Sequence, residues 1–243
     1  MTRILTTILL LFGLNSFGQN TRIDTLIIPI FNQFTDTQIN LRFPIVKTGN
    51  KQNDLLINLD IKNKLTDNEF PDQPIDTSII RWAEDRVIFL DFKVTFNKNG
   101  ILSLHIDAEG CGAYCTSWTE YLNYSTKTGK SLKLSEVVDT TGNFRTKIYA
   151  DKDKQYDQQK IQLKTLLSDP EADFDEDSYN WTFEEYENCQ NSFYLKSFAL
   201  YPDHLEIIAK CYLPNVMKNL TPFIDLKYNY NDIKDYLKIK NCN

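Results

Sequence analysis

Apolar and polar residues alternate over much of this 243-residue chain, which is the pattern of half-buried β-strands. The clearest stretch is 90–124, where three alternating runs are separated by Asn99-Gly100 and by a loop bounded by Cys111 and Cys115. Asn-Gly is a strong hairpin signal, so we predict an antiparallel meander here. Similar runs predict further strands at 25–31, 39–46, 193–200, 205–213 and 224–230.

A different spacing predicts helices between these strands. Ile57, Ile61 and Leu65 recur every fourth residue, which indicates a helix over 54–65. Residues 143–167 form the longest helical candidate, but the middle is so polar that we expect either one exposed helix or two helices broken by a loop. Shorter helices are predicted at 182–188 and near 233–239, and loops at 67–77 and 169–179, with 82–87 leading into the sheet.

These elements predict an α+β fold in which an antiparallel β-sheet meander packs against helices. Each half of the chain contains hairpins with helices between them, which suggests two related subdomains. We place the boundary near Leu132, giving subdomains at 20–131 and 132–243.

The first residues have the organisation of a secretory signal peptide. Arg3 precedes an apolar run over 4–14, too short to span a bilayer, and small residues follow at Ser16 and Gly18. We therefore predict a signal peptide over 1–19, cleaved on either side of Gln19; a buried N-terminal element is the alternative. No later run is long enough for a membrane helix, so the protein is expected in the periplasm or secreted.

The charge weighs against nucleic acid as a partner. The formal net charge is −6, and loss of Arg3 with the signal peptide makes it −7. Binding to phosphate backbones needs a concentrated basic surface, which an acidic chain lacks. An acidic surface permits a cationic partner but is also an ordinary means of staying soluble.

Export favours disulfides among the five cysteines. Four cysteines allow three pairings. Cys111 and Cys115 are near enough in sequence to close a small loop, Cys189 and Cys211 would then form a second bridge, and Cys242 would remain free. Metal ligation is not expected, because a zinc site needs a second pair of ligands and the two histidines are isolated.

Candidate catalytic residues are sparse. Two carboxylates at suitable separation could hydrolyse a glycosidic bond. The available pairs are Asp107 with Glu109 and Glu184 with Glu185 or Glu187. Each pair is more simply interpreted as part of the solvent-exposed face of a strand or helix. His105 and His204 lack a nucleophile-elbow context, so we predict neither catalytic residues nor a cofactor.

A recognisable pattern is carried by the segments 57–61, 92–96, 100–104, 112–114, 121–124, 128–134, 198–208 and 224–237. Together these segments resemble a known pair of bacterial extracytoplasmic modules, DUF4163-like followed by DUF3298-like. These modules occur in anti-sigma factors of the RsiV type and beside polysaccharide deacetylase domains, and one anti-sigma member uses its ectodomain as a lysozyme receptor. The resemblance implies an α+β fold over most of the chain.

The departures from these families limit what the resemblance implies. The sequence shows no sigma-binding segment and no His-x-x-x-His metal pair, and Cys115 stands where proline is common. We therefore expect an exported, non-catalytic module that binds an envelope glycan or an extracellular protein such as lysozyme, with a secreted hydrolase as the alternative. The predicted ligand contacts are in the cysteine loop and its neighbouring strand: Gly112, Ala113, Tyr114 and Trp118.

The aromatic side chains are consistent with a third class of function, that of an interaction protein with an exposed aromatic patch. Trp82, Trp118, Tyr114, Tyr121 and Trp181 could form such a patch, although aromatic residues in alternating strands more often belong to the core.

Overall fold

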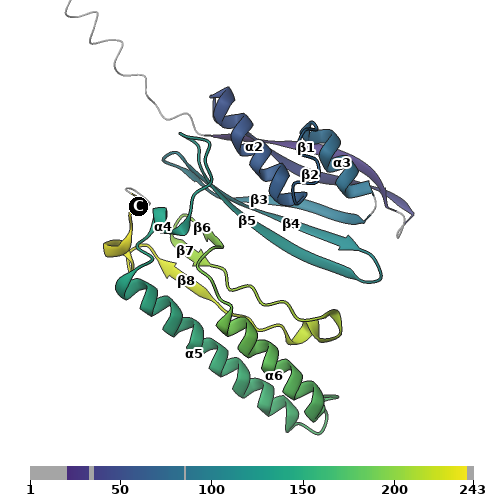
Figure 1. The fold of residues 1–243 in the computed structure, drawn as a ribbon, viewed down its shortest axis with the longest axis vertical. Helices are drawn as coiled ribbons and strands as arrows, with labels where there is room; N and C mark the ends of the chain where they lie inside the picture. Colours follow the sequence, from purple (N-terminus) through teal and green to yellow (C-terminus); the bar gives the residue numbers. More distant parts are fainter. Residues whose placement is uncertain (1–20, 33–35, 85, 240–243) are drawn as a thin grey trace, which may run out of the picture.

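The computed structural model describes residues 21–32, 36–84 and 86–239, and these form an α+β fold, as the sequence predicts. The predicted signal peptide and Cys242 lie outside the described residues. Three antiparallel sheets, with strand orders β1-β2, β3-β4-β5 and β6-β7-β8, combine with helices in the arrangement of Figure 1.

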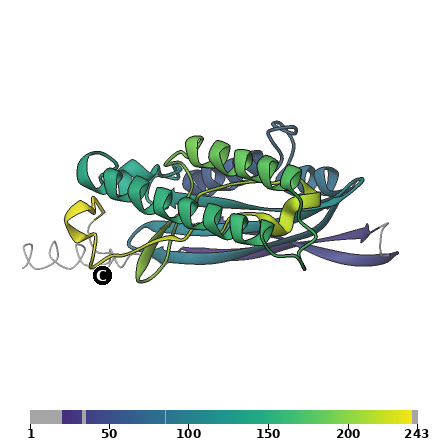
Figure 2. The same ribbon diagram turned by 90° about the horizontal axis from the view of Figure 1, so that it is seen from below.

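The first sheet is a long hairpin of β1 (Arg22–Asn32) and β2 (Thr37–Lys47). Helices α2 (Lys51–Leu65) and α3 (Ile75–Glu84) pack against the first two sheets around a shared apolar core. Asn58 fixes α2 to β2, because its buried side chain both accepts from Val46 N at 2.8 Å and donates to Val46 O at 2.9 Å. In Figure 2 the β1–β2 hairpin lies below the helices, and α2 and α3 contact it directly.

The second sheet is the predicted meander, formed by β3 (Val87–Lys98), β4 (Ile101–Cys111) and β5 (Cys115–Ser125). Asn99 and Gly100 connect β3 to β4 with φ of 57° and 81°, the left-handed region that the predicted Asn-Gly turn requires. The alternation buries Leu102, Leu104 and Ile106 completely, so this sheet forms the floor of the N-terminal core.

The third sheet and a pair of helices form the C-terminal part. The short α4 (Leu134–Val137) precedes α5 (Gly142–Leu167) and α6 (Glu176–Asn191), which lie side by side. Strands β6 (Phe198–Leu200), β7 (His204–Ile207) and β8 (Leu226–Asn229) share a core with the first part of α5, and the 3-10 helices η1 (Asn215–Leu220) and η2 (Lys234–Tyr236) complete the chain.

The helices account for the largest differences from the sequence prediction. Helix α3 is not among the predicted elements, because 67–77 is predicted as a loop and 82–87 as the approach to the sheet. Helix α5 is a single unbroken helix of 26 residues, which is one of the two predicted alternatives. Helix α6 begins six residues before the predicted 182–188. Asp175 caps α6 by accepting from Ser178 N at 2.8 Å.

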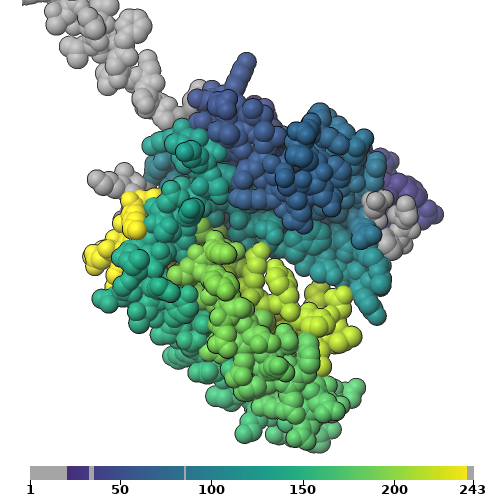
Figure 3. All heavy atoms as spheres, in the orientation of Figure 1, coloured from purple at the N-terminus to yellow at the C-terminus, as the bar shows by residue number. Residues whose placement is uncertain are grey.

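The last strands are shorter than predicted, because β6 begins at Phe198 and β7 ends at Ile207. The two parts of the chain have largely separate cores, and Figure 3 shows the blue α2–α3 region and the green α6 as two masses.

The subdomain boundary at 131/132 and the structural relatedness of the two halves stay predictions. In the described part of the chain, no helix has the length and apolarity needed to cross a membrane.

Candidate functional site

The cysteine loop connects β4 to β5 and is closed by the predicted disulfide. Cys111 and Cys115 are bonded with their Cα atoms 4.0 Å apart, and Gly112 N donates to Tyr114 O at 3.1 Å. Tyr114 projects from the loop with 71% of its surface exposed. The second predicted disulfide, between Cys189 and Cys211, also forms.

A pocket of about 550 Å³ lies beside this loop, between the second sheet and the α2–α3 region. It is formed where α3 passes over the ends of β3, β4 and β5. Its lining combines large aromatic, cationic and carboxylate side chains with backbone of the cysteine loop: Glu69, Phe70, Arg81, Trp82, Arg86, Val87, Gly110, Cys111, Gly112 and Trp118.

Two tryptophans form the aromatic wall of this pocket, which we call the tryptophan pocket. Trp82 of α3 and Trp118 of β5 pack edge to face, with ring centroids 6.2 Å apart and planes at 89°. Gly110 makes room for Trp118, since a Cβ at this position would lie 3.4 Å from the indole and 3.6 Å from Arg86 O. Both tryptophans are partly exposed, and both also pack against the N-terminal core.

Two exposed arginines supply the positive charge of the pocket. Arg81 is on α3, and Arg86 follows the helix at the start of β3. Neither guanidinium forms an ion pair in the part of the chain that the structure describes. The backbone at Arg86 is tied to the cysteine loop, because its carbonyl accepts from Cys111 N at 2.8 Å.

A buried lysine holds the α2–α3 connection, which forms another side of the pocket. Lys62 of α2 is completely buried, and its Nζ donates to Phe70 O at 2.7 Å, Pro71 O at 3.1 Å and Gln73 O at 3.4 Å. These bonds hold the α2–α3 connection against the core. Glu69 and Phe70 of this connection are thereby kept at the pocket.

Comparisons with known proteins identify the fold. No family model matches this sequence, and a search of curated proteins found no match. A solved DUF3298 family protein from Bacteroides fragilis matches with a TM-score of 0.53, covering 90% of this chain and 95% of that chain at 14% identity. The chain has the fold of a DUF3298 family protein. A second such protein, from Pseudomonas aeruginosa, covers 91% of this chain and 96% of its own length at 12% identity and a TM-score of 0.48.

Within this DUF3298 fold, the predicted contact residues divide into two groups. Gly112 and Trp118 line the tryptophan pocket, whereas Ala113 and Tyr114 are exposed on the cysteine loop and are not among its lining residues. Their contact with a ligand stays a prediction. Trp82 was considered only as one of several aromatic residues that could be core or contact.

Arg81 is not among the predicted site residues because α3 is not predicted, and Glu69 and Arg86 lie in the connections on either side of this helix. The signal was present: Ile75, Ile79 and Trp82 recur at helical spacing, and Pro74 stands directly before the first helical residue. Recognition of this helix places Arg81 and Trp82 next to each other on an element that must pack on the sheet.

The predicted carboxylate pairs occupy other surroundings. Asp107 accepts from Thr119 Oγ1 at 2.7 Å and lies 3.7 Å from His105 Nε2, while Glu187 of α6 pairs with Lys160 at 3.3 Å. The carboxylate of Glu109 lies within 4.8 Å of the sulfur atoms of the cysteine loop. Those sulfurs are bonded to each other, which removes them as thiolate ligands for a metal ion.

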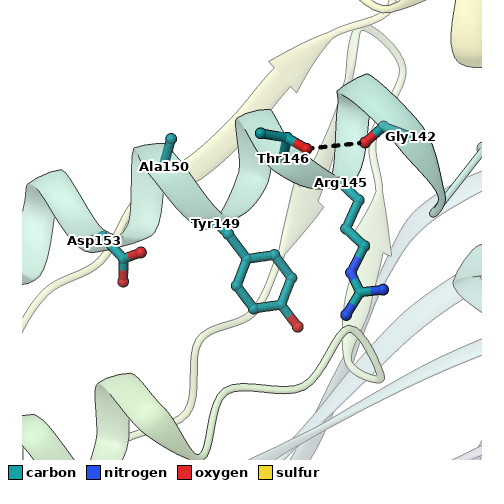
Figure 4. A pocket seen from close by; sticks show the side chains of 6 residues that line it. All are labelled: Gly142, Arg145, Thr146, Tyr149, Ala150 and Asp153. Atoms are coloured by element: carbon teal, nitrogen blue, oxygen red, sulfur yellow. Dashed lines mark hydrogen bonds between the residues drawn. The ribbon is translucent and has the colours of Figure 1, made fainter.

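A second depression of about 630 Å³ runs along the first turns of α5. In Figure 4 the side chains of Arg145, Tyr149 and Asp153 lie on the same side of the helix. The Arg145 guanidinium lies 5.4 Å from the Tyr149 ring centroid, and Asp153 accepts from Gln190 at 2.8 Å, so these groups already have partners within the C-terminal part.

A polar seam joins the two parts of the DUF3298 fold. Asp107 and Tyr121 of the second sheet lie near Tyr201 and Glu206 of the β6–β7 hairpin. The pKa of Tyr201 is raised from 10.0 to about 12, first by burial and then by the negative charge of Glu206, to which its hydroxyl donates. Burial and the same carboxylates raise the pKa of Tyr121.

Proposed function

We propose that this chain is an exported, non-catalytic binding module of the DUF3298 family, and that it binds a glycan of the cell envelope in the tryptophan pocket. The shared fold supports the family assignment. The N-terminal signal-peptide pattern and the two disulfides support export, because disulfides persist in oxidising compartments.

The composition of the tryptophan pocket is the observation that carries the proposal. The chain has three tryptophans and six arginines, and two of each line this one pocket. Tryptophan and arginine are the residues most enriched where binding energy is concentrated. Partly exposed indole faces stack on the apolar faces of sugar rings, and the polar groups around them are suited to hydroxyl and acyl substituents.

The same lining favours binding over hydrolysis. Glycoside hydrolysis in its common form needs two carboxylates on either side of the scissile bond. Glu69 is the single carboxylate among the described residues that line the pocket. The two arginines also disfavour a basic protein such as lysozyme as the occupant, because like charges would face each other.

Co-sedimentation with purified cell-wall sacculi tests this proposal. We expect the wild-type protein to sediment with the sacculi and the Trp82→Ala and Trp118→Ala variants to remain mostly in solution. Trp181→Ala is the matched control, because Trp181 lies on α6, away from the pocket, and its loss should leave binding unchanged. Circular dichroism establishes that the variants are folded.

Two results would contradict the proposal. Equal sedimentation of all four proteins would remove the pocket from the binding site. Release of reducing sugar ends by the wild-type protein would replace the non-catalytic module with the hydrolase.

A further inference from the structure

We infer that the tryptophan pocket selects sugar units that carry a carboxylate, so that its ligand is an acidic glycan. This inference rests on the proposed function and adds the chemical class of the ligand. It follows from the charges that line the pocket, the exposure of its two arginines and the way the backbone fixes their position.

The first argument is the contrast between the pocket and the rest of the chain. The formal net charge is −6, yet the pocket contains two arginines and one carboxylate. Arg81 and Arg86 flank the end of α3, which brings both side chains to the same opening. A local excess of positive charge on an acidic protein attracts an anionic group while the remaining surface repels it.

The second argument is that these guanidinium groups belong to exposed residues of the pocket. Both side chains are exposed, and neither is engaged in an ion pair within the described residues. By comparison, Arg42 pairs with Asp91 at 3.2 Å and Arg22 with Asp24. A planar guanidinium matches the two oxygens of a carboxylate with parallel hydrogen bonds, which gives direction as well as attraction.

The third argument is that the site is held in place by its surroundings. The Arg86 carbonyl is bonded to Cys111 N, and the disulfide closes the loop that follows Cys111. Trp82 is adjacent to Arg81 on α3 and packs against Trp118. A sugar ring stacked on one of these indoles would lie in the same pocket as both arginines, which could then bind its carboxylate.

Glu69 adds a preference of its own. Its carboxylate accepts hydrogen bonds from sugar hydroxyls but repels a second anionic group. The pocket thus suits a unit with one carboxylate and several hydroxyl or acetamido groups better than a densely charged polymer such as a polyphosphate.

Matched glycan probes test the inference by isothermal titration calorimetry. The acidic probe consists of strands of alternating N-acetylglucosamine and N-acetylmuramic acid from which the peptides have been removed, leaving each lactyl carboxylate free. The neutral probe consists of the same strands after conversion of those carboxylates to methyl amides. Charge-assisted hydrogen bonds contribute about 1.5–3 kcal/mol, so we expect the acidic probe to bind the wild-type protein about 10- to 100-fold more tightly.

Arginine variants locate this preference. Arg81→Gln and Arg86→Gln should reduce the difference between the two probes to a few-fold, because they weaken binding of the acidic probe much more than binding of the neutral probe. Both positions are exposed, so these substitutions should not affect folding. Arg145→Gln is the control, because Arg145 lies on α5 in the C-terminal part and should leave the preference intact.

The outcomes separate this inference from the proposed function. Equal affinity of the wild-type protein for both probes would overturn selection of a carboxylate while leaving glycan binding in place. Absence of binding to either probe would overturn both. A preference that survives in both pocket arginine variants would also overturn the inference, because the carboxylate would then be recognised elsewhere.

Discussion

At the scale of single residues, Lys62 shows how the chain holds its candidate binding site together. A fully buried ammonium group is costly unless its charge is compensated. Here three backbone carbonyls of the α2–α3 connection accept from Nζ. A surface loop is thereby tied to the helix that packs on the core, and this loop carries Glu69 and Phe70 into the tryptophan pocket.

Substitution Lys62→Met should therefore reduce both stability and ligand binding. The methionine preserves most of the apolar volume but leaves the carbonyls without their charged donor, which we expect to cost about 2–3 kcal/mol. Urea unfolding followed by circular dichroism measures this loss. Lys64→Met is the control: Lys64 is exposed on the same helix and pairs with Asp60 at 2.8 Å, so its loss should cost about 0.5 kcal/mol or less. Equal effects of the two substitutions would contradict the role of Lys62.

Sequence reasoning at this scale works best where a residue belongs to a regular pattern. The meander predicts that Gly112 and Trp118 lie near one loop, and both line the tryptophan pocket, whereas their contact with a ligand stays a prediction. The burial of Lys62 could not be predicted, since its partners are the carbonyls of an irregular connection. The spacing of residue types along the chain does not predict the orientation of these carbonyl groups.

At the scale of elements, the two disulfides have different structural roles. The Cys111–Cys115 bridge closes a loop between two strands that already pair with each other. The Cys189–Cys211 bridge joins the end of α6 to an extended segment after β7, with 22 residues of sequence separation. The entropy that a disulfide removes from the unfolded chain grows with the sequence separation of its two cysteines.

Removal of the longer bridge should therefore destabilise the protein more. For the double variant Cys189→Ala, Cys211→Ala we expect a loss of about 3 kcal/mol in the free energy of unfolding, against about 2 kcal/mol for Cys111→Ala, Cys115→Ala. Denaturant unfolding of both variants provides the comparison. A larger loss for the cysteine-loop variant would show that this bridge stabilises more than its own hairpin.

Helix α5 illustrates why the burial of an element is harder to predict than its bounds, since the predicted 143–167 agrees with the observed Gly142–Leu167 to within one residue. Its polar middle predicts exposure or a break, yet Lys152 is almost completely buried. The Nζ atom of Lys152 donates to Gln190 O at 2.7 Å and lies 5.1 Å from the Tyr149 ring centroid. Helix α6 supplies this carbonyl acceptor, and the spacing of residues within α5 does not reveal such a tertiary contact.

At the scale of the whole molecule, the seam between the second sheet and the β6–β7 hairpin joins the two parts. Asn123 Nδ2 donates to Phe198 O at 2.7 Å, and Leu200 N donates to Ser103 Oγ at 3.0 Å. Beside these bonds, the hydroxyl of Tyr201 donates to Glu206 within the polar seam. The arrangement depends on a protonated phenol between negative charges.

The seam should make stability sensitive to alkaline pH. Because the pKa of Tyr201 is about 12 in the folded protein, against an ordinary value of 10.0, its protonated form contributes fully below pH 10. That contribution is lost as the pH rises through 12, since the unfolded chain releases its proton first. Between about pH 9 and about pH 11, the wild-type protein should therefore lose more unfolding free energy than Tyr201→Phe, as measured by urea titration. Parallel losses in both proteins would contradict this role of Tyr201.

The fold as a whole was more predictable than the site. Alternation and turn signals identify the meander, the cysteine loop and the α+β class, because these follow from local periodicity. The tryptophan pocket combines α3, the end of β3 and the β4–β5 loop, which are brought together only by packing. Sequence periodicity therefore predicts the side of the pocket formed by the meander and the cysteine loop, and does not predict the side formed by α3.

The central claim, that the tryptophan pocket binds the glycan, is tested most directly by the indole N–H signals of the three tryptophans. Titration of ¹⁵N-labelled protein with soluble cell-wall glycan strands should shift the signals of Trp82 and Trp118, while Trp181 on α6 serves as an internal reference that stays in place. A titration that leaves the signals of Trp82 and Trp118 unmoved, with or without a shift at Trp181, would contradict the account.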